Sequence, residues 1–254
     1  MNISYIDDIQ AWRGFLPLLK RLIESSGSKR IVEIGGGANP ALPIDYVLEK
    51  GLEYTILDIS AEELAKAPEG YHKIQADIAA KVFQFEGEYD LIFSNMLAEH
   101  VSDALCFHEN IFKMLRNGGL AFHYFPTLFS LPMVINKMVS ENFGQLILNK
   151  ILPGLRVKTG NRGKFPAYYK WCLGPLRIQE HRLTGVGFKV LEYRGTFGYH
   201  GYFHNLKWLH RLHDLIVSVQ LRFPIAVFTS GAQVLLQKGS FTGLECDYKF
   251  PKQE

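Results

Sequence analysis

The hydrophobic positions of this chain follow two different periods. Apolar residues recur at helical spacing in residues 7–24, whereas short apolar runs bounded by turn residues indicate buried strands. The predicted helices cover residues 7–24, 43–50, 61–67, 101–119 and 175–187. The predicted strands cover residues 30–34, 53–59, 71–77, 89–95, 120–126, 188–195 and 232–238. Strands and helices therefore alternate through most of the chain.

This alternation predicts a single α/β domain over residues 1–254. We expect a doubly wound, Rossmann-like, mostly parallel seven-stranded sheet, with helices on both faces and an antiparallel last strand. Two stretches, 127–172 and 196–230, interrupt the alternation. Segments of this length inside a domain are usually functional, and we expect both insertions to form a substrate lid over one end of the sheet.

The composition narrows the class of protein. The three cysteines have no metal-ligand spacing and are odd in number, which favours a reducing, cytoplasmic setting and no metal site. The first ten residues contain acids and no apolar run, so no signal peptide is expected. The longest apolar region, 215–236, is interrupted by Gln, Arg and Pro, which argues against a membrane span.

Charge divides the chain into unlike halves. Residues 1–126 hold 11 Lys and Arg against 18 Asp and Glu, whereas residues 127–254 hold 17 against 7. The basic half suits an anionic ligand, such as a phosphorylated substrate, an acidic glycan or a lipid surface, although solvated faces alone would also explain it.

Residues 206–219 form an amphipathic helical pattern. Leu206, Leu209, Leu212, Ile216 and Val219 recur at helical spacing, beside the cations Lys207, Arg211 and Arg222. We expect this face to pack on the domain. The alternative is a helix that lies on an anionic membrane, which would bring the protein to the inner membrane face.

A glycine-rich turn at 35–37 follows the strand that ends at Ile34, and Asn39 and Pro40 can open a helix. Such a turn lets a ligand approach the backbone and the free N–H groups of a helix start. A phosphate-binding P-loop would need Gly-Lys-Ser/Thr here. A dinucleotide site would need a third glycine at the position of Pro40. S-adenosylmethionine has no phosphate, so its site needs neither the Gly-Lys-Ser/Thr sequence nor the third glycine.

Polar residues at the ends of the next strands extend this site, because ligands of open α/β sheets bind at the carboxyl ends of the strands. Asp58 ends the second predicted strand, where a carboxylate suits two ribose hydroxyls. Asp77 follows the third strand and can reach an exocyclic amine of a base. Ser94, Asn95 and Met96 end the fourth strand, beside the expected reacting end of the cofactor.

The order of these motifs resembles the class I S-adenosylmethionine-dependent methyltransferases. The matching segments are VEIGGGANP, YTILDIS, IQADI, YDLIFSNMLAEHV and MLRNGGLAFHYFPT, all within residues 30–126. The resemblance implies S-adenosylmethionine as cofactor, with specific residues around each part of it. These are Glu33, Gly35 and Gly37 at the methionine portion, Asp58 with Ile59 at the ribose, Asp77 with Ile78 at the adenine, and Ser94 with Asn95 closing the pocket.

Methyl transfer needs a positioned acceptor and, for a hydroxyl, a general base. His100 follows Glu99 at the pocket edge and is the first candidate base, although both could instead brace the loop. His123 is a second candidate, but its place within a parallel strand favours a buried, hydrogen-bonded side chain. Aromatic and basic residues of the insertions are candidates for substrate contact: Lys164, Tyr168, Tyr169, Lys170 and His200.

The second half of the chain is similar to methyltransferases of bacterial surface-polysaccharide and glycolipid biosynthesis, through FPTLFSLP, KFPAYYKWCLGP and YRGTFGYHGYFH. This resemblance implies O-methylation of a sugar or a phosphorylated glycan intermediate. One alternative is methylation of a small hydrophobic metabolite, such as a quinone or polyketide. A second is a non-catalytic binding module, although the apolar content of the insertions is unlike a nucleic-acid surface. The acceptor and the oligomeric state stay open.

Overall fold

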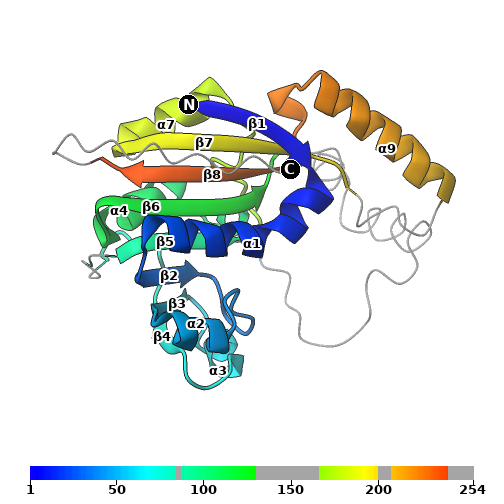
Figure 1. The fold of residues 1–254 in the computed structure, drawn as a ribbon. Helices are drawn as coiled ribbons and strands as arrows, with labels where there is room; N and C mark the ends of the chain where they lie inside the picture. Colours follow the sequence, from blue (N-terminus) through cyan, green and yellow to red (C-terminus); the bar gives the residue numbers. More distant parts are fainter. Residues whose placement is uncertain (84–86, 88, 130–165, 200–206, 240–254) are drawn as a thin grey trace.

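The computed structural model describes residues 1–83, 87, 89–129, 166–199 and 207–239. Within them, one eight-stranded sheet has the order β1-β7-β8-β6-β5-β2-β3-β4 (Figure 1). All neighbouring strands are parallel except β8, which runs antiparallel to β6 and β7. The strands are β1 (Asn2–Asp7), β2 (Arg30–Ile34), β3 (Glu53–Asp58), β4 (His72–Gln75), β5 (Tyr89–Asn95), β6 (Leu115–Pro126), β7 (Phe188–Phe197) and β8 (Gly231–Lys238). The predicted α/β class and its antiparallel last strand are confirmed.

Strand β1 is the one strand that the sequence pattern did not predict. It pairs in parallel with the outer side of β7, and Ser4 Oγ donates to Glu192 Oε1 at 2.9 Å. Its pattern is weak because an edge strand of six residues is only half-buried. Asp7 ends the strand and caps α1 (Asp8–Ser26), because its carboxylate accepts the Ile9 N–H at 2.8 Å.

The helices cover both faces of the sheet. They are α1 (Asp8–Ser26), α2 (Ile44–Lys50), α3 (Ala61–Lys66), α4 (Ala104–Met114), α7 (Arg177–Val186) and α9 (Lys207–Arg222), with short 3-10 turns η1 (Ala98–His100) and η2 (Ala226–Phe228). One core cluster joins α1, α2 and α3 to one face of the sheet, and another joins α4 and α7 to the opposite face. Burial of these apolar side chains is the main source of stability.

The predicted helix over 101–119 is too long. Helix α4 ends at Met114, and Leu115 already pairs with Tyr89 at the start of β6. Gly119 allows a close backbone approach rather than a helix stop, since a Cβ there would lie 2.9 Å from Arg116 O and 3.0 Å from Tyr89 O. Tertiary pairing therefore overrides the local helical pattern.

Helix α9 packs on the domain through a different face from the one predicted. His213 and Val217 are buried, whereas Leu212, Ile216 and Val219 are exposed. The expectation that these three residues pack on the domain is therefore wrong. Leu206 and the side chain of Leu209 lie outside the described residues.

The insertions are described only in part. Residues 130–165 and 200–206 lie outside the described residues, as do the candidate substrate contacts Lys164 and His200. In the part of the chain that is described, no helix has the length and apolarity needed to cross a membrane.

Candidate active site

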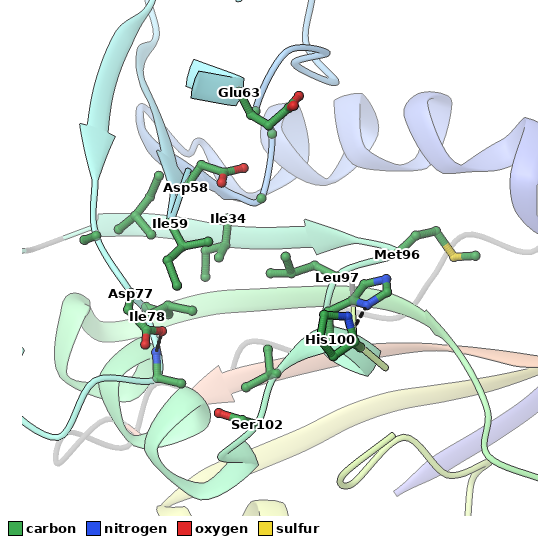
Figure 2. Close-up of a pocket in the computed structure, with 18 of the residues that line it drawn as sticks. Ile34, Asp58, Ile59, Glu63, Asp77, Ile78, Met96, Leu97, His100 and Ser102 are labelled. Carbon is green, nitrogen blue, oxygen red and sulfur yellow. Dashed lines mark hydrogen bonds between the residues drawn. The ribbon is translucent and has the colours of Figure 1, made fainter. Parts of the chain in front are cut away.

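A cavity of about 530 Å³ opens at the carboxyl ends of β2, β3, β4 and β5. Its walls come from the glycine turn after β2, from the loops that follow β3 and β4, and from the segment 96–102 after β5 (Figure 2). Pro166 and Tyr168 complete the wall from the far half of the chain. Volumes of this size are typical of small-molecule and cofactor sites.

The glycine turn adopts backbone angles that other residues disfavour. Gly35 has φ +78° and Gly37 has φ +40°, and the Gly35 N–H donates to Leu57 O at 2.8 Å. A Cβ at Gly35 would lie 2.5 Å from Leu97 Cδ1, and one at Gly37 would lie 3.1 Å from Asp58 Oδ2. Both glycines line the cavity, so the turn presents bare backbone to a ligand.

Glu33 supports this turn from below rather than lining the cavity. Its buried carboxyl accepts the Ala41 N–H at 3.0 Å and the Tyr54 hydroxyl. A Cβ at Gly36 would lie 2.8 Å from Glu33 Cδ, so the carboxyl and the turn are in close contact. Burial raises the pKa of Glu33 to about 7.

Asp58 forms the wall at the end of β3. Its carboxylate accepts the Ser60 N–H at 2.9 Å, and partial burial raises its pKa above the usual value. The neighbouring Ile59 is exposed and also lines the cavity. Glu63 of α3 adds a second carboxylate that the sequence reasoning did not single out. Ser60 caps α3, because its Oγ accepts the Glu63 N–H at 3.2 Å.

Asp77 and Ile78 form the wall after β4. The Asp77 carboxylate accepts the Ala79 N–H at 2.9 Å, which is a local turn contact (Figure 2). Ile78 is buried, and Asn110 Nδ2 donates to its carbonyl at 2.7 Å. Helix α4 therefore holds this loop against the cavity.

The charges of the residues that line the cavity fit S-adenosylmethionine. The described lining includes three carboxylates, Asp58, Glu63 and Asp77, and no Lys or Arg. A pyrophosphate cofactor would face uncompensated negative charge here, whereas a cationic, phosphate-free cofactor is attracted by it. The bare glycine turn and the carboxylate at the end of β3 are available to such a molecule.

Of the three predicted residues at the end of β5, only Met96 lines the cavity. Ser94 is buried, with Oγ 2.8 Å from His123 Nδ1, and neither Ser94 nor Asn95 lines the cavity. Met96 does line it, with φ +53° and its N–H donating to Tyr124 O at 2.7 Å. The prediction that Ser94 and Asn95 close the pocket stays untested, but the observed wall is formed by Met96 and Leu97.

His100 lines the cavity and is one-third exposed. Its Nδ1 lies 2.9 Å from the carbonyl oxygen of Pro166, which can only accept, so Nδ1 carries the proton (Figure 2). In the neutral ring Nε2 is then unprotonated. Nε2 lies 3.7 Å from Glu99 Oε1.

Glu99 is buried beneath this histidine. Burial raises its pKa to about 7, against the lowering effect of His100. Among the described residues, its Oε2 atom has no hydrogen-bond partner. The Glu99 backbone carbonyl accepts the N–H groups of Tyr168 and Tyr169 at 2.7 and 3.0 Å. The same residue therefore ties the segment after β5 to the end of the first insertion.

The predicted substrate residues separate in the structure. Tyr168 is 48% exposed and lines the cavity, whereas Tyr169 packs against the core with φ +52°. Lys170 is exposed. The pKa of Asp103 is lowered mainly by the hydrogen bond that its carboxylate accepts from the Cys106 N–H, and to a smaller extent by the charge of Lys170. The sequence reasoning missed the lining residues Leu97, Val101, Ser102 and Pro166, which carry no titratable or glycine signal.

His123 is fully buried in β6 and does not line the cavity. Burial lowers its pKa well below the usual range. Its ring packs against Phe107 and His108, with centroids 5.4 and 5.7 Å away. This geometry gives His123 no contact with the cavity, so we assign it no catalytic role.

His210, His213 and Asp214 of α9 place potential ligand atoms within 4.8 Å of one another. However, His213 Nε2 accepts the Tyr199 N–H at 2.7 Å, and its Nδ1 lies 3.3 Å from Asp214 Oδ1. His213 thus joins α9 to the end of β7, and we assign no metal to this group.

Comparisons with known proteins agree with this geometry. Residues 8–159, more than half of the chain, match the family model described as a methyltransferase domain. A search of curated proteins found no match.

Several solved structures share the fold. A putative S-adenosylmethionine-dependent methyltransferase from Listeria monocytogenes has a TM-score of 0.55 at 12% identity, covering 92% of this chain and 100% of that one. One from Mesorhizobium loti has a TM-score of 0.51 at 17% identity, covering 87% and 96%.

Phosphoethanolamine N-methyltransferase 2 from Haemonchus contortus, in complex with S-adenosyl-L-methionine, has a TM-score of 0.52 at 18% identity, covering 90% of this chain. This chain spans about half the length of that protein, 53%. The chain belongs to the methyltransferase-domain family and shares its fold with solved S-adenosylmethionine-dependent methyltransferases.

Proposed function

We propose that the protein transfers a methyl group to a hydroxyl of a sugar or a phosphorylated glycan or glycolipid intermediate, with His100 as the general base. The observation that carries the proposal is the 2.9 Å contact between His100 Nδ1 and the Pro166 carbonyl. It leaves Nε2 as the basic nitrogen of a residue that lines the cavity. A hydroxyl acceptor benefits from such a base.

In this mechanism the bound cofactor supplies a methyl group activated on a sulfonium centre. His100 Nε2 would accept the proton of the acceptor hydroxyl while the oxygen bonds to the methyl carbon and the methyl–sulfur bond breaks, so that sulfur leaves as a neutral thioether. Glu99, with Oε1 3.7 Å from that nitrogen, stabilises the resulting imidazolium when its carboxyl is ionised. The Pro166 carbonyl keeps the ring oriented throughout.

The cofactor contacts of the proposal combine the cavity lining with the family resemblance. Gly35 and Gly37 lie along the methionine portion, and Glu33 supports their turn. Asp58 and Ile59 bind the ribose. Asp77 and Ile78 lie at the adenine, held by α4 through Asn110.

The acceptor class is supported by the second half of the chain. Tyr168 exposes an aromatic face beside His100, which suits the apolar side of a sugar ring. Lys170 is exposed two residues later, in a half of the chain rich in Lys and Arg. A phosphate on the acceptor would find complementary charge there.

The direct test supplies labelled S-adenosylmethionine and a panel of acceptors that contains sugar phosphates, sugar nucleotides and hydroquinones. We expect label to enter the sugar panel as an O-methyl ether. His100→Gln should lower kcat by about 100-fold or more, the usual contribution of a general base. His181→Gln, an exposed histidine on α7, is the matched control and should keep the full rate.

Transfer to hydroquinones alone would replace this proposal with the hydrophobic-metabolite alternative. The two also differ in their response to charge. Replacing Lys158, Arg162, Lys164 and Lys170 with Gln should impair a glycan-phosphate enzyme and leave a quinone enzyme nearly unchanged. An unaltered kcat in His100→Gln would refute the assignment of His100 as the general base and would indicate that the enzyme acts by positioning the two substrates.

A further inference from the structure

Helix α9 and the turn that follows it carry an exposed apolar surface. Leu212, Leu215, Ile216, Val219 and Phe223 are between 47% and 67% exposed. Ile225, Val227 and Phe228, which follow the helix in sequence, are also exposed. We call Leu212, Leu215, Ile216, Val219 and Phe223 the α9 stripe. Exposed apolar surfaces of this continuity mark interaction sites on soluble domains.

The α9 stripe lies on one side of the helix because its members are separated by three or four positions. The Phe223 N–H donates to Val219 O at 2.9 Å, so Phe223 continues the same helical turn. The other side of α9 contacts the domain. Val217 and His213 are buried there, and His213 Nε2 accepts the Tyr199 N–H at 2.7 Å. The stripe is therefore directed away from the domain.

Cations accompany the stripe. Arg211 and Arg222 are both exposed and lie eleven residues apart, which is close to three helical turns, so they share one flank of α9. Asp214, the only acid of the helix, is half-exposed, and its Oδ1 lies 3.3 Å from His213 Nδ1. An apolar stripe with a cationic flank is typical of a helix that lies in the interface of an anionic membrane.

Helix α9 is attached at the same edge of the sheet as the cavity. Because β7 and β6 both run antiparallel to β8, and β6 is parallel to β5, the carboxyl ends of β7 and β5 lie at the same edge of the sheet. The cavity lies at that edge, and α9 is joined to the carboxyl end of β7 through Tyr199 and His213. Figure 1 shows α9 beyond the ends of β1 and β7.

We propose that the α9 stripe docks on an anionic lipid membrane, with the helix in the plane of the interface and the cavity edge of the sheet directed toward the lipid. We prefer an anionic membrane to a protein partner because Arg211 and Arg222 flank an apolar helical face, and such a helix binds anionic lipid through both apolar burial and charge attraction. The proposal holds for any methyl acceptor and does not rest on the function proposed above.

The test measures cosedimentation of the purified full chain with vesicles of phosphatidylcholine and phosphatidylglycerol, and with vesicles of phosphatidylcholine alone. We expect binding to the anionic vesicles and little to the neutral ones. Arg211→Gln/Arg222→Gln should weaken binding by about 25-fold, which is about fivefold for each cation near the lipid surface.

The stripe itself is tested by Leu215→Glu/Val219→Glu, which we expect to weaken vesicle binding by about tenfold or more. Leu48→Glu/Ile178→Glu is the matched control, because it places the same two charges at exposed apolar positions of α2 and α7. The control should bind as the parent does, and both variants should melt close to the parent temperature.

Three results would overturn the proposal. The first is a parent protein that does not bind anionic vesicles. The second is a stripe variant that melts far below the control without lipid, which would show that the chain itself covers the stripe. The third is a parent dimer that the stripe variant dissociates, measured by sedimentation velocity, which would assign the surface to a second copy.

Discussion

Two buried glutamates, one beneath the glycine turn and one beside the candidate base, have similarly raised pKa values but different hydrogen-bond partners. Burial raises the pKa of Glu33 and of Glu99 to about 7. Glu33 accepts hydrogen bonds from the Ala41 N–H and the Tyr54 hydroxyl. Among the described residues, one oxygen of Glu99 has no partner, and the other lies 3.7 Å from His100 Nε2.

Desolvation alone therefore does not identify a reactive carboxyl, because it raises the pKa of both glutamates. A buried carboxyl whose hydrogen bonds are satisfied by the backbone and a tyrosine holds a loop in place. A buried carboxyl with remaining hydrogen-bonding capacity beside a histidine on the cavity wall can respond to a proton. The glycine-turn region is therefore scaffold, and the region of η1 is where we expect proton transfer.

We expect the largest effect at Glu33, the buried carboxyl beneath the glycine turn. The pKa of Glu33 is higher in the folded chain than its usual 4.5, so the folded state holds this proton more tightly. Stability from this group is present at low pH and is lost as pH rises through 7. Relative to Glu33→Gln, the parent should lose about 2.5 kcal/mol of unfolding free energy between about pH 5 and pH 8.

Urea unfolding at the two pH values measures this difference. Glu53→Gln is the control, because Glu53 lies on the neighbouring strand β3 but is exposed. Parallel pH dependence in the parent and in Glu33→Gln would show that Glu33 does not titrate in this range.

The second effect concerns Asp58, a half-buried carboxylate that is less buried than either glutamate. Asp58→Asn should weaken binding of S-adenosylmethionine by tenfold or more, about 1.4 kcal/mol, because the ribose hydroxyls lose a charged acceptor. Isothermal titration calorimetry measures the affinity. Glu62→Gln, on the adjoining helix α3 and outside the cavity lining, removes the same charge as a control. Equal affinities in all three proteins would refute the ribose assignment.

The smallest effect tests the reactive side. As pH rises through about 7 the Glu99 carboxylate forms, and the rate of the parent should rise with it. At about pH 8, Glu99→Gln should be about fivefold slower than the parent, or about 1 kcal/mol, because solvent screens an imidazole that is one-third exposed. A pH profile of kcat measures both effects. A rise in rate near pH 7 that persists in Glu99→Gln would assign the titration to another group.

The cofactor half of the site was predictable because its determinants are local. A strand, a glycine turn and an acid at the end of the next strand follow one another within residues 31–58, and the carboxyl ends of parallel strands meet at one edge. Gly35, Gly37, Asp58 and Asp77 accordingly line one cavity. Binding of the cofactor by these residues stays a prediction.

Other features depend on contacts between distant residues. Residues 115–119 have a helical pattern, yet they join β6 because Tyr89 pairs with Leu115. Strand β1 exists because β7, nearly two hundred residues away, offers an edge. The exposure of the α9 stripe likewise follows from which side of the helix His213 and Val217 bury. Helical periodicity identifies an apolar face but cannot say what covers it.

The alternating α/β architecture, the glycine turn without a P-loop signature and the acids at the strand ends could be predicted from the sequence, because periodicity, glycine conformation and residue charge are local properties. The tertiary structure was needed to show that the Pro166 carbonyl contacts His100, that Glu99 and not Glu33 lies beside this candidate base, and that His123 lies away from the cavity. Those outcomes depend on burial and on hydrogen bonds between residues that folding brings together.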